Sequence, residues 1–105
     1  MSNTSNSSGF VVIAEFLVKA GSMAAFLEAA RKDASQSLSK EPGCSQFDIV
    51  LPESSSDSVL FYEVYDSREA FDAHLATPHV AEFRQAFPRL NMTERPVRFG
   101  SQFQT

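Results

Sequence analysis

Two histidines, His74 and His79, are the only histidines in the 105-residue chain, and a strand-like run just before them carries Tyr62, Glu63 and Tyr65. Imidazole titrates near neutral pH, so a histidine close to such a strand can take up and return a proton during a reaction. We predict an acid–base site here, with His74 as the base, because it lies just before a helix break that can open a cleft. His79 lies in the first turn of the next helix, where it could instead be exposed.

Other kinds of chemistry have no clear signature in the sequence. The two histidines flank a Thr-Pro break with no cysteine nearby, so they offer too few ligands for a metal site at a known spacing. The sequence has no glycine-rich phosphate loop, nucleophile elbow or dinucleotide fingerprint, so no cofactor is expected. Cys44 is the single cysteine. It cannot form an internal disulfide, and we interpret it as a small buried residue in a reducing, cytoplasmic compartment.

Hydrophobic periodicity predicts the elements that must position these residues. The expected order is a strand over 10–18, a helix over 22–38, strands over 44–51 and 58–65, a short helix capped by Asp66, a helix capped by Thr77, and a last strand over 95–103. Pro42-Gly43 ends the first helix, and the polar loop 52–57 makes the second and third strands a hairpin. The order β-α-β-β-α(α)-β is that of a ferredoxin-like α+β fold, whose antiparallel sheet carries its helices on one face.

Both faces of the predicted sheet carry apolar side chains. The face expected to meet the helices carries Phe10, Val12, Ala14, Phe16, Val18, Phe47, Ile49, Leu51, Leu60, Tyr62, Val64, Val97, Phe99 and Phe103. It packs against a helix stripe of Met23, Phe26, Leu27, Ala30, Ala34 and Leu38. The other face carries Val11, Ile13, Leu17, Phe61 and Tyr65 beside Gln46, Asp48, Glu15, Glu63 and Arg98. An exposed apolar face of this extent indicates a homodimer, although β-propensity on a solvated face would give a similar pattern.

Length and charge limit the remaining possibilities. The chain suits one domain over 10–105, preceded by a Ser/Asn-rich flexible tail over 1–9 that lacks the features of a signal peptide. The net charge is −4 and basic residues are scattered, which argues against a nucleic-acid or membrane partner. No apolar run has the length of a membrane span.

Three segments resemble the antibiotic-biosynthesis-monooxygenase family, near its small quinol monooxygenases and its isomerase that degrades a phosphorylated quorum-sensing signal. They are EPGCSQFD (41–48), YEVY (62–65) and AFDAHLATPH (70–79). The resemblance implies a dimeric ferredoxin-like α/β-barrel with a pocket between sheet and helices in each subunit. The residues that match the family's motifs are His74 and His79 for its paired histidines, Tyr62, Glu63 and Tyr65 for its strand motif, and Asp48 for its aspartate after phenylalanine.

The resemblance leads us to expect a cofactor-independent monooxygenase acting on a small aromatic or quinol substrate. His74 would be the base, Tyr62 or Asp48 would orient it, and the substrate would contact His79, Glu63, Tyr65, Phe47, Phe71 and Phe83. The chain has no tryptophan, which disfavours haem degradation. Ala34-Ser35 stands where the isomerase has a histidine, which weakens that assignment. An isomerase of a small phosphorylated or sugar-like signal and a non-catalytic dimeric ligand-binding or stress-response module remain the alternatives.

Overall fold

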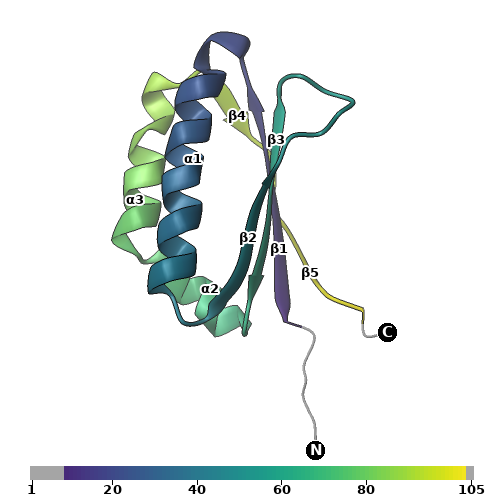
Figure 1. Cartoon of the computed structure of the whole chain (residues 1–105), viewed down its shortest axis with the longest axis vertical. Coiled ribbons are helices and arrows are strands. Elements are labelled where there is room, and N and C mark those ends of the chain that lie inside the picture. Colours follow the sequence, from purple (N-terminus) through teal and green to yellow (C-terminus); the bar gives the residue numbers. More distant parts are fainter. Residues whose placement is uncertain (1–8, 104–105) are drawn as a thin grey trace, which may run out of the picture.

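The computed structural model describes residues 9–103, so the tail expected over 1–9 lies, apart from Gly9, outside the described residues. Its elements are β1 (Phe10–Val18), α1 (Ala20–Lys40), β2 (Cys44–Val50), β3 (Ser58–Tyr65), α2 (Arg68–Leu75), α3 (Pro78–Gln85), a 3-10 helix (Phe87–Arg89), β4 (Met92–Glu94) and β5 (Arg98–Ser101). This order confirms the α+β ferredoxin-like fold: an antiparallel sheet with its helices on one face (Figure 1). Within 9–103, no helix has the length and apolar character needed to cross a membrane.

The sheet has the strand order β2-β3-β1-β4, and β5 also pairs with β1. β4 pairs with residues 16–18 of β1 and β5 with residues 10–13. The single last strand predicted over 95–103 is therefore wrong, because two short strands replace it. Pro96 lies between them and has no N–H to donate, which breaks the ladder at this edge.

The core lies between the sheet and the helices and consists largely of phenylalanine rings. The ring centroid of Phe26 on α1 lies 5.1 Å from that of Phe16 on β1 and 5.8 Å from that of Phe83 on α3. Phe61 of β3 lies 4.9 Å from Phe16. Aromatic pairs at such separations add stabilisation beyond the area that they bury. The packing holds α1 and α3 side by side across the sheet (Figure 1).

The register between β1 and β3 corrects the predicted faces of β3. Val12 lies opposite Glu63 and Ile13 opposite Tyr62. Paired residues of antiparallel strands point to the same face, so Glu63 and its neighbours Phe61 and Tyr65 face the helices. Tyr62 was predicted to face them, and that prediction is wrong. Both faces of β3 carry apolar side chains, so its sequence does not show the alternation that would identify the buried face. Only the pairing with β1 decides which residues face the helices.

Several smaller predictions also fail. Leu38, Leu51 and Phe103, expected between the sheet and the helices, are 47%, 58% and 90% exposed. Ser67 rather than Asp66 caps α2, because its side chain accepts a hydrogen bond from the backbone N–H of Ala70. Each failure lies at the end of an element, where periodicity stops constraining the chain.

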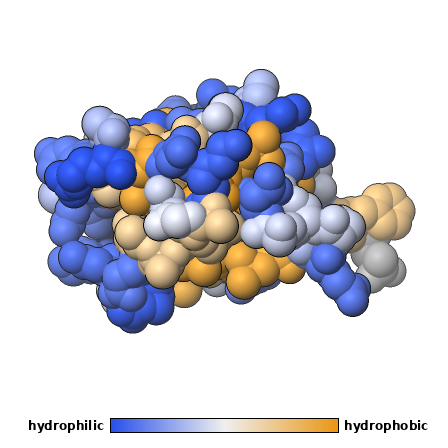
Figure 2. Space-filling model, turned by 90° about the horizontal axis from the view of Figure 1, so that it is seen from above, coloured by the Kyte–Doolittle hydropathy of each residue, from blue (hydrophilic) through white to orange (hydrophobic). Residues whose placement is uncertain are grey.

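The sheet face turned away from the helices remains rich in apolar side chains after this correction. It carries Val11, Ile13, Leu17, Leu60, Tyr62 and Val64 together with Glu15, Gln46, Asp48 and Arg98. Figure 2 views one end of the molecule from above, with the sheet seen end-on: hydrophilic residues cover most of the left side, where the helices lie, and apolar residues reach the surface toward the middle of this end. A mixed face of this kind is typical of a surface that a partner covers.

Thr77 fixes the break between α2 and α3. Its side-chain oxygen accepts a hydrogen bond from the backbone N–H of Val80 at 3.3 Å and donates one to the carbonyl of His74 at 2.7 Å. We expect Thr77→Ala to lower the free energy of unfolding in urea by about 1 kcal/mol, as loss of an N-cap does. The control Thr93→Ala, at an exposed site on β4, should change it by less than about 0.5 kcal/mol. Equal losses in both variants would contradict this role.

Candidate active site

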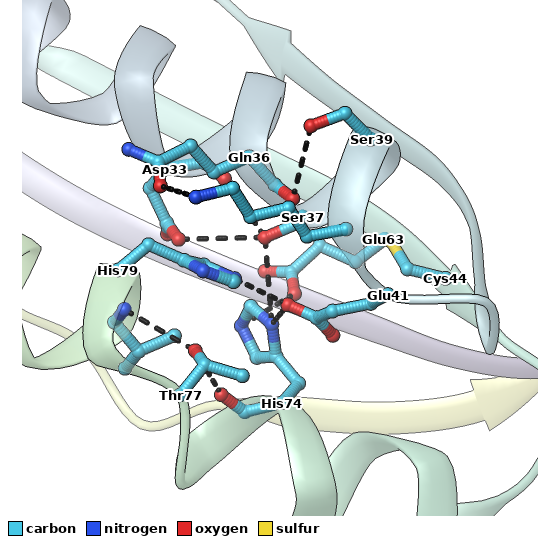
Figure 3. Close-up of polar contacts among 12 residues, drawn as sticks. Asp33, Gln36, Ser37, Ser39, Glu41, Cys44, Glu63, His74, Thr77 and His79 are labelled. Atoms are coloured by element: carbon cyan, nitrogen blue, oxygen red, sulfur yellow. Dashed lines mark hydrogen bonds and ion pairs between the residues drawn. The ribbon is translucent and has the colours of Figure 1, made fainter.

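His74 and His79 both point inward, although a helix break separates them (Figure 3). His74 lies in the last turn of α2, and His79 follows Pro78 at the start of α3. The break turns the chain so that both rings face α1, and only 4% and 6% of the two residues is exposed. The sequence left open whether His79 is exposed, and the structure buries it.

Glu41 lies between the two imidazole rings. It follows the last residue of α1, and its Oε2 lies 2.9 Å from Nδ1 of His74 and 2.5 Å from Nε2 of His79. A carboxylate only accepts, so each of these ring nitrogens donates to it. The hydrogen-bond network thereby assigns the proton of neutral His74 to Nδ1 and leaves Nε2 as an acceptor.

Asp33 and Ser37 extend this cluster along α1, and the predicted apolar stripe of the helix missed both. Both are buried. The Ser37 hydroxyl donates to the backbone carbonyl of Asp33 at 2.8 Å, and its oxygen lies 3.5 Å from Nδ1 of His74. Asp33 and Ser37 lie one turn apart on one face of α1, and Glu41, four residues further on, follows directly after the helix. That spacing was the signal in the sequence that could have revealed them.

Glu63 approaches His74 from the sheet. Its Oε1 accepts a hydrogen bond from the Tyr65 hydroxyl at 2.5 Å and lies 3.9 Å from Nε2 of His74. Burial raises the pKa of Glu63 to about 7, although the hydrogen bond from Tyr65 acts in the opposite direction. Burial and the neighbouring Glu63 raise the pKa of Tyr65, so its phenol stays protonated. Glu63 can therefore hold or release a proton near neutral pH.

Asp33 has a similarly altered titration. Burial raises the pKa of its carboxyl group from 3.8 to about 6, and the nearby His74 and His79 oppose this rise. Two buried carboxyl groups with raised pKa values beside two histidines form a group that can exchange protons.

A cavity of about 220 Å³ lies between the sheet and the helices, next to this cluster. Its walls include Val12, Phe16, Phe61, Phe71, Phe83 and Phe99, and its polar lining includes Asp33, Glu63 and His74. A second cavity of about 400 Å³ lies between α1 and α3, with Asp33 and His79 in its lining. His74 thus borders the smaller cavity and His79 the larger one. Glu41 contacts both histidine rings and so links the two side chains.

Most of the predicted site residues come together in the structure. His74, His79, Glu63 and Tyr65 belong to the buried cluster, Phe71 and Phe83 line the 220 Å³ cavity, and the ring of Phe47 lies 6.1 Å from that of His74.

Tyr62 and Asp48 do not join them. The two are paired across β2 and β3 on the sheet face away from the helices, and Asp48 is exposed, accepting a hydrogen bond from Gln46 at 2.6 Å. Neither orients His74 in the same chain, and Glu41 contacts it instead.

Cys44 is buried, and burial raises the pKa of its thiol to about 11. A protonated thiol is a poor nucleophile, so Cys44 is a packing residue, as the sequence indicated.

The fold and the site define the chain as a small ferredoxin-like domain with a buried histidine–carboxylate cluster beside an apolar cavity. Residues 9–86 match the model of the family described as antibiotic biosynthesis monooxygenase, and the chain belongs to that family.

Solved structures resemble this chain over most of its length. A candidate antibiotic biosynthesis monooxygenase from Nitrosomonas europaea is 28% identical with a TM-score of 0.77, over 90% of this chain and 88% of that one. A protein from Mycobacterium tuberculosis is 26% identical with a TM-score of 0.76, over 93% and 96%. A Deinococcus radiodurans protein, 21% identical with a TM-score of 0.82 over 91% and 94%, shows the same fold.

One curated relative, an uncharacterised protein from Synechocystis, is 40% identical over 50 residues. The match covers 48% of this chain and 34% of that protein, so the matched segment spans about a third of the relative's length.

Proposed function

We propose that the protein is a cofactor-independent monooxygenase that oxidises a small aromatic or quinol substrate in the 220 Å³ cavity. The observation that carries this proposal is the orientation of His74. Glu41 accepts a hydrogen bond from its Nδ1, so Nε2 is free to accept a proton at the wall of an apolar cavity. A cavity of about 150 Å³ accommodates benzene, so this one has room for one substituted aromatic ring.

The proposed reaction begins when Nε2 of His74 removes a proton from a hydroxyl group of the hydroquinone. The resulting anion is electron-rich enough to reduce dioxygen, which then adds to a ring carbon as a peroxide. The peroxide takes up a proton, its O–O bond breaks, and water leaves. The balance is hydroquinone plus O₂ to hydroxyquinone plus water. The substrate ring and the phenylalanine side chains of the cavity would displace water from the reacting atoms.

Glu63 and Asp33 are proposed to supply and receive protons. Both line the same cavity as His74, and their pKa values of about 7 and about 6 allow either protonation state near neutral pH. Phe71 and Phe83 are proposed to contact the substrate ring. Tyr62 and Asp48 have no role in this scheme.

Oxygen consumption with a panel of one- and two-ring hydroquinones tests the proposal. We expect uptake of one O₂ per substrate, with the hydroxyquinone as product and no need for added flavin, haem or metal. Hydroquinones that autoxidise at the same rate with and without protein throughout the panel would refute it.

We also propose that two copies pair through the apolar sheet face that carries Ile13, Leu17 and Tyr62. Light scattering after size exclusion should give twice the chain mass of 11.6 kDa. Ile13→Lys should shift the mass toward that of the monomer, because a buried unpaired charge opposes association. A wild-type monomer would contradict this assembly.

A second candidate function is isomerisation of a small phosphorylated ligand, which the arginines in the cavity lining favour. Arg68 and Arg84 both line the cavity, where guanidinium groups suit a phosphate. Arg84 already pairs with Glu94 at 3.2 Å, and Arg68 stacks 4.8 Å above Phe99. Tight binding of inorganic phosphate combined with no oxygen consumption would favour this alternative.

A further inference from the structure

We propose that Glu41, His74 and His79 form a binding site for a first-row divalent metal ion of the Zn²⁺ class. One oxygen of Glu41 and one ring nitrogen of each histidine lie within 4.8 Å of one another. They come from the end of α1, the end of α2 and the start of α3. Two imidazoles and a carboxylate are a donor set that binds Zn²⁺ and Fe²⁺. The sequence argument against a metal counted the two histidines alone and lacked this third ligand.

The spacing of the donor atoms suits an ion of this size. Zn²⁺ binds imidazole nitrogen and carboxylate oxygen at about 2.0–2.2 Å, so the ligand atoms of a tetrahedral site lie about 3.3–3.6 Å apart. Oε2 of Glu41 and Nδ1 of His74 are already 2.9 Å apart, and Nε2 of His79 lies 2.5 Å from the same oxygen. The three donor atoms now lie within 4.8 Å of one another, so admitting the ion requires the side chains to shift until all three pairs reach this spacing.

The groups around the three ligands support the same inference. A histidine that binds a metal through one nitrogen usually donates the other N–H to a carboxylate or carbonyl group. Nε2 of His74 faces Oε1 of Glu63 at 3.9 Å, and Ser37 lies beside Nδ1. A separation of 3.9 Å is longer than a hydrogen bond, so the His74 ring would have to move closer to Glu63 on metal binding for Glu63 to orient it.

The charge of the cluster points in the same direction. Asp33, Glu41 and Glu63 are three carboxyl groups gathered around the two imidazoles. The ion pairs of lysine and arginine described in 9–103 lie at the surface, between Arg31 and Glu28, Lys32 and Glu82, Arg68 and Asp72, and Arg84 and Glu94. None reaches the cluster, and a dication would offset its negative charge. Protonation of Asp33, Glu63 or the two histidines would reduce this charge as well, and the ¹⁵N spectra of the histidines distinguish protonation from metal binding.

Metal binding would have a consequence for the proposed activity, and this consequence alone rests on the proposed function. An ion on Nδ1 of His74 displaces the proton held there, so the neutral ring carries its proton on Nε2. The base is then lost, and Zn²⁺ should inhibit oxygen consumption in proportion to its occupancy.

The test is a titration of tag-free, chelator-treated protein with Zn²⁺. Calorimetry and NMR of ¹⁵N-labelled histidine detect the binding. The chain has two histidines, so the four ring nitrogens can be assigned with one variant. We expect one Zn²⁺ per chain and large ¹⁵N shifts at Nδ1 of His74 and Nε2 of His79. Neither readout depends on catalysis, so a failed oxygenase proposal leaves this test intact.

Matched variants locate the site. Glu41→Gln and His79→Gln each remove a ligand and should weaken Zn²⁺ binding by more than about 100-fold, and Glu63→Gln should weaken it by about 10–100-fold through the His74 ring. Glu82→Gln is the control: it makes the same chemical change at an exposed position on α3, and binding should stay within about twofold.

Three results would overturn the proposal. One is the absence of binding by wild-type protein. Another is a shift at other ring nitrogens. A third is equal weakening by Glu41→Gln and Glu82→Gln, which would mean adventitious binding at the surface. If both histidines prove doubly protonated near neutral pH and their ¹⁵N shifts do not change with Zn²⁺, protonation rather than a metal offsets the charge of the carboxylates.

Discussion

Replacing His74 by glutamine is expected to lower kcat for oxygen consumption by about 10²–10⁴-fold, the usual contribution of a positioned base. Glutamine keeps a similar length and can still donate to Glu41, but it cannot accept the substrate's proton at the position of Nε2. The KM for the hydroquinone should change little, because the apolar walls that bind the ring remain. Initial rates with an oxygen electrode, alongside circular dichroism to verify folding, provide the measurement.

Tyr62→Phe and Asp48→Asn are the matched controls for this prediction. The sequence suggested that one of them orients the base, whereas the structure places both on the opposite sheet face. We expect their kcat values to stay within about threefold of wild type. A His74→Gln enzyme with full activity would remove His74 from the mechanism, and a severe loss in either control would mean that the opposite face takes part.

Asp33→Asn is expected to make the free energy of unfolding depend less on pH as the pH rises. Burial raises the pKa of Asp33 from 3.8 to about 6, so the folded state binds this proton more tightly than the unfolded state. The stabilisation is complete below about pH 4 and is lost as pH rises through about 6. For a shift of about two pKa units, wild type should lose about 2 kcal/mol relative to Asp33→Asn between about pH 4.5 and about pH 7.5.

Urea unfolding of both proteins at the two pH values, at one protein concentration, provides the measurement. The change in the free energy of unfolding between the two pH values is compared between wild type and Asp33→Asn. Other groups that face Asp33, including Glu41, His74 and His79, remain in both proteins, so most of their own titration cancels. Asp72→Asn, at an exposed position on α2, should show no such difference. A wild-type advantage that grows with pH would reverse the sign and refute the raised pKa.

Local signals in the sequence predicted much of the fold. Thr77 and Pro78 marked the start of α3, and Pro42-Gly43 marked the end of α1; both effects act within a few residues along the chain. The face of β3 was predicted wrongly, because both of its faces are apolar and the choice depends on pairing with β1. The sequence predicted one last strand over 95–103, and the division of this strand at Pro96 was not predicted.

The sequence by itself determined the order of the elements as far as α3, the position of His74 just before a helix break and the apolar stripe of α1, because each follows from signals within one helix or strand. Only the tertiary structure decided which side chain orients His74 by a hydrogen bond to its ring. Glu41 is 33 residues from His74 and 38 from His79, and it meets them because α1 ends beside the break between α2 and α3. Helical periodicity relates residues three or four apart, so a contact across such a distance depends on how the helices pack on the sheet.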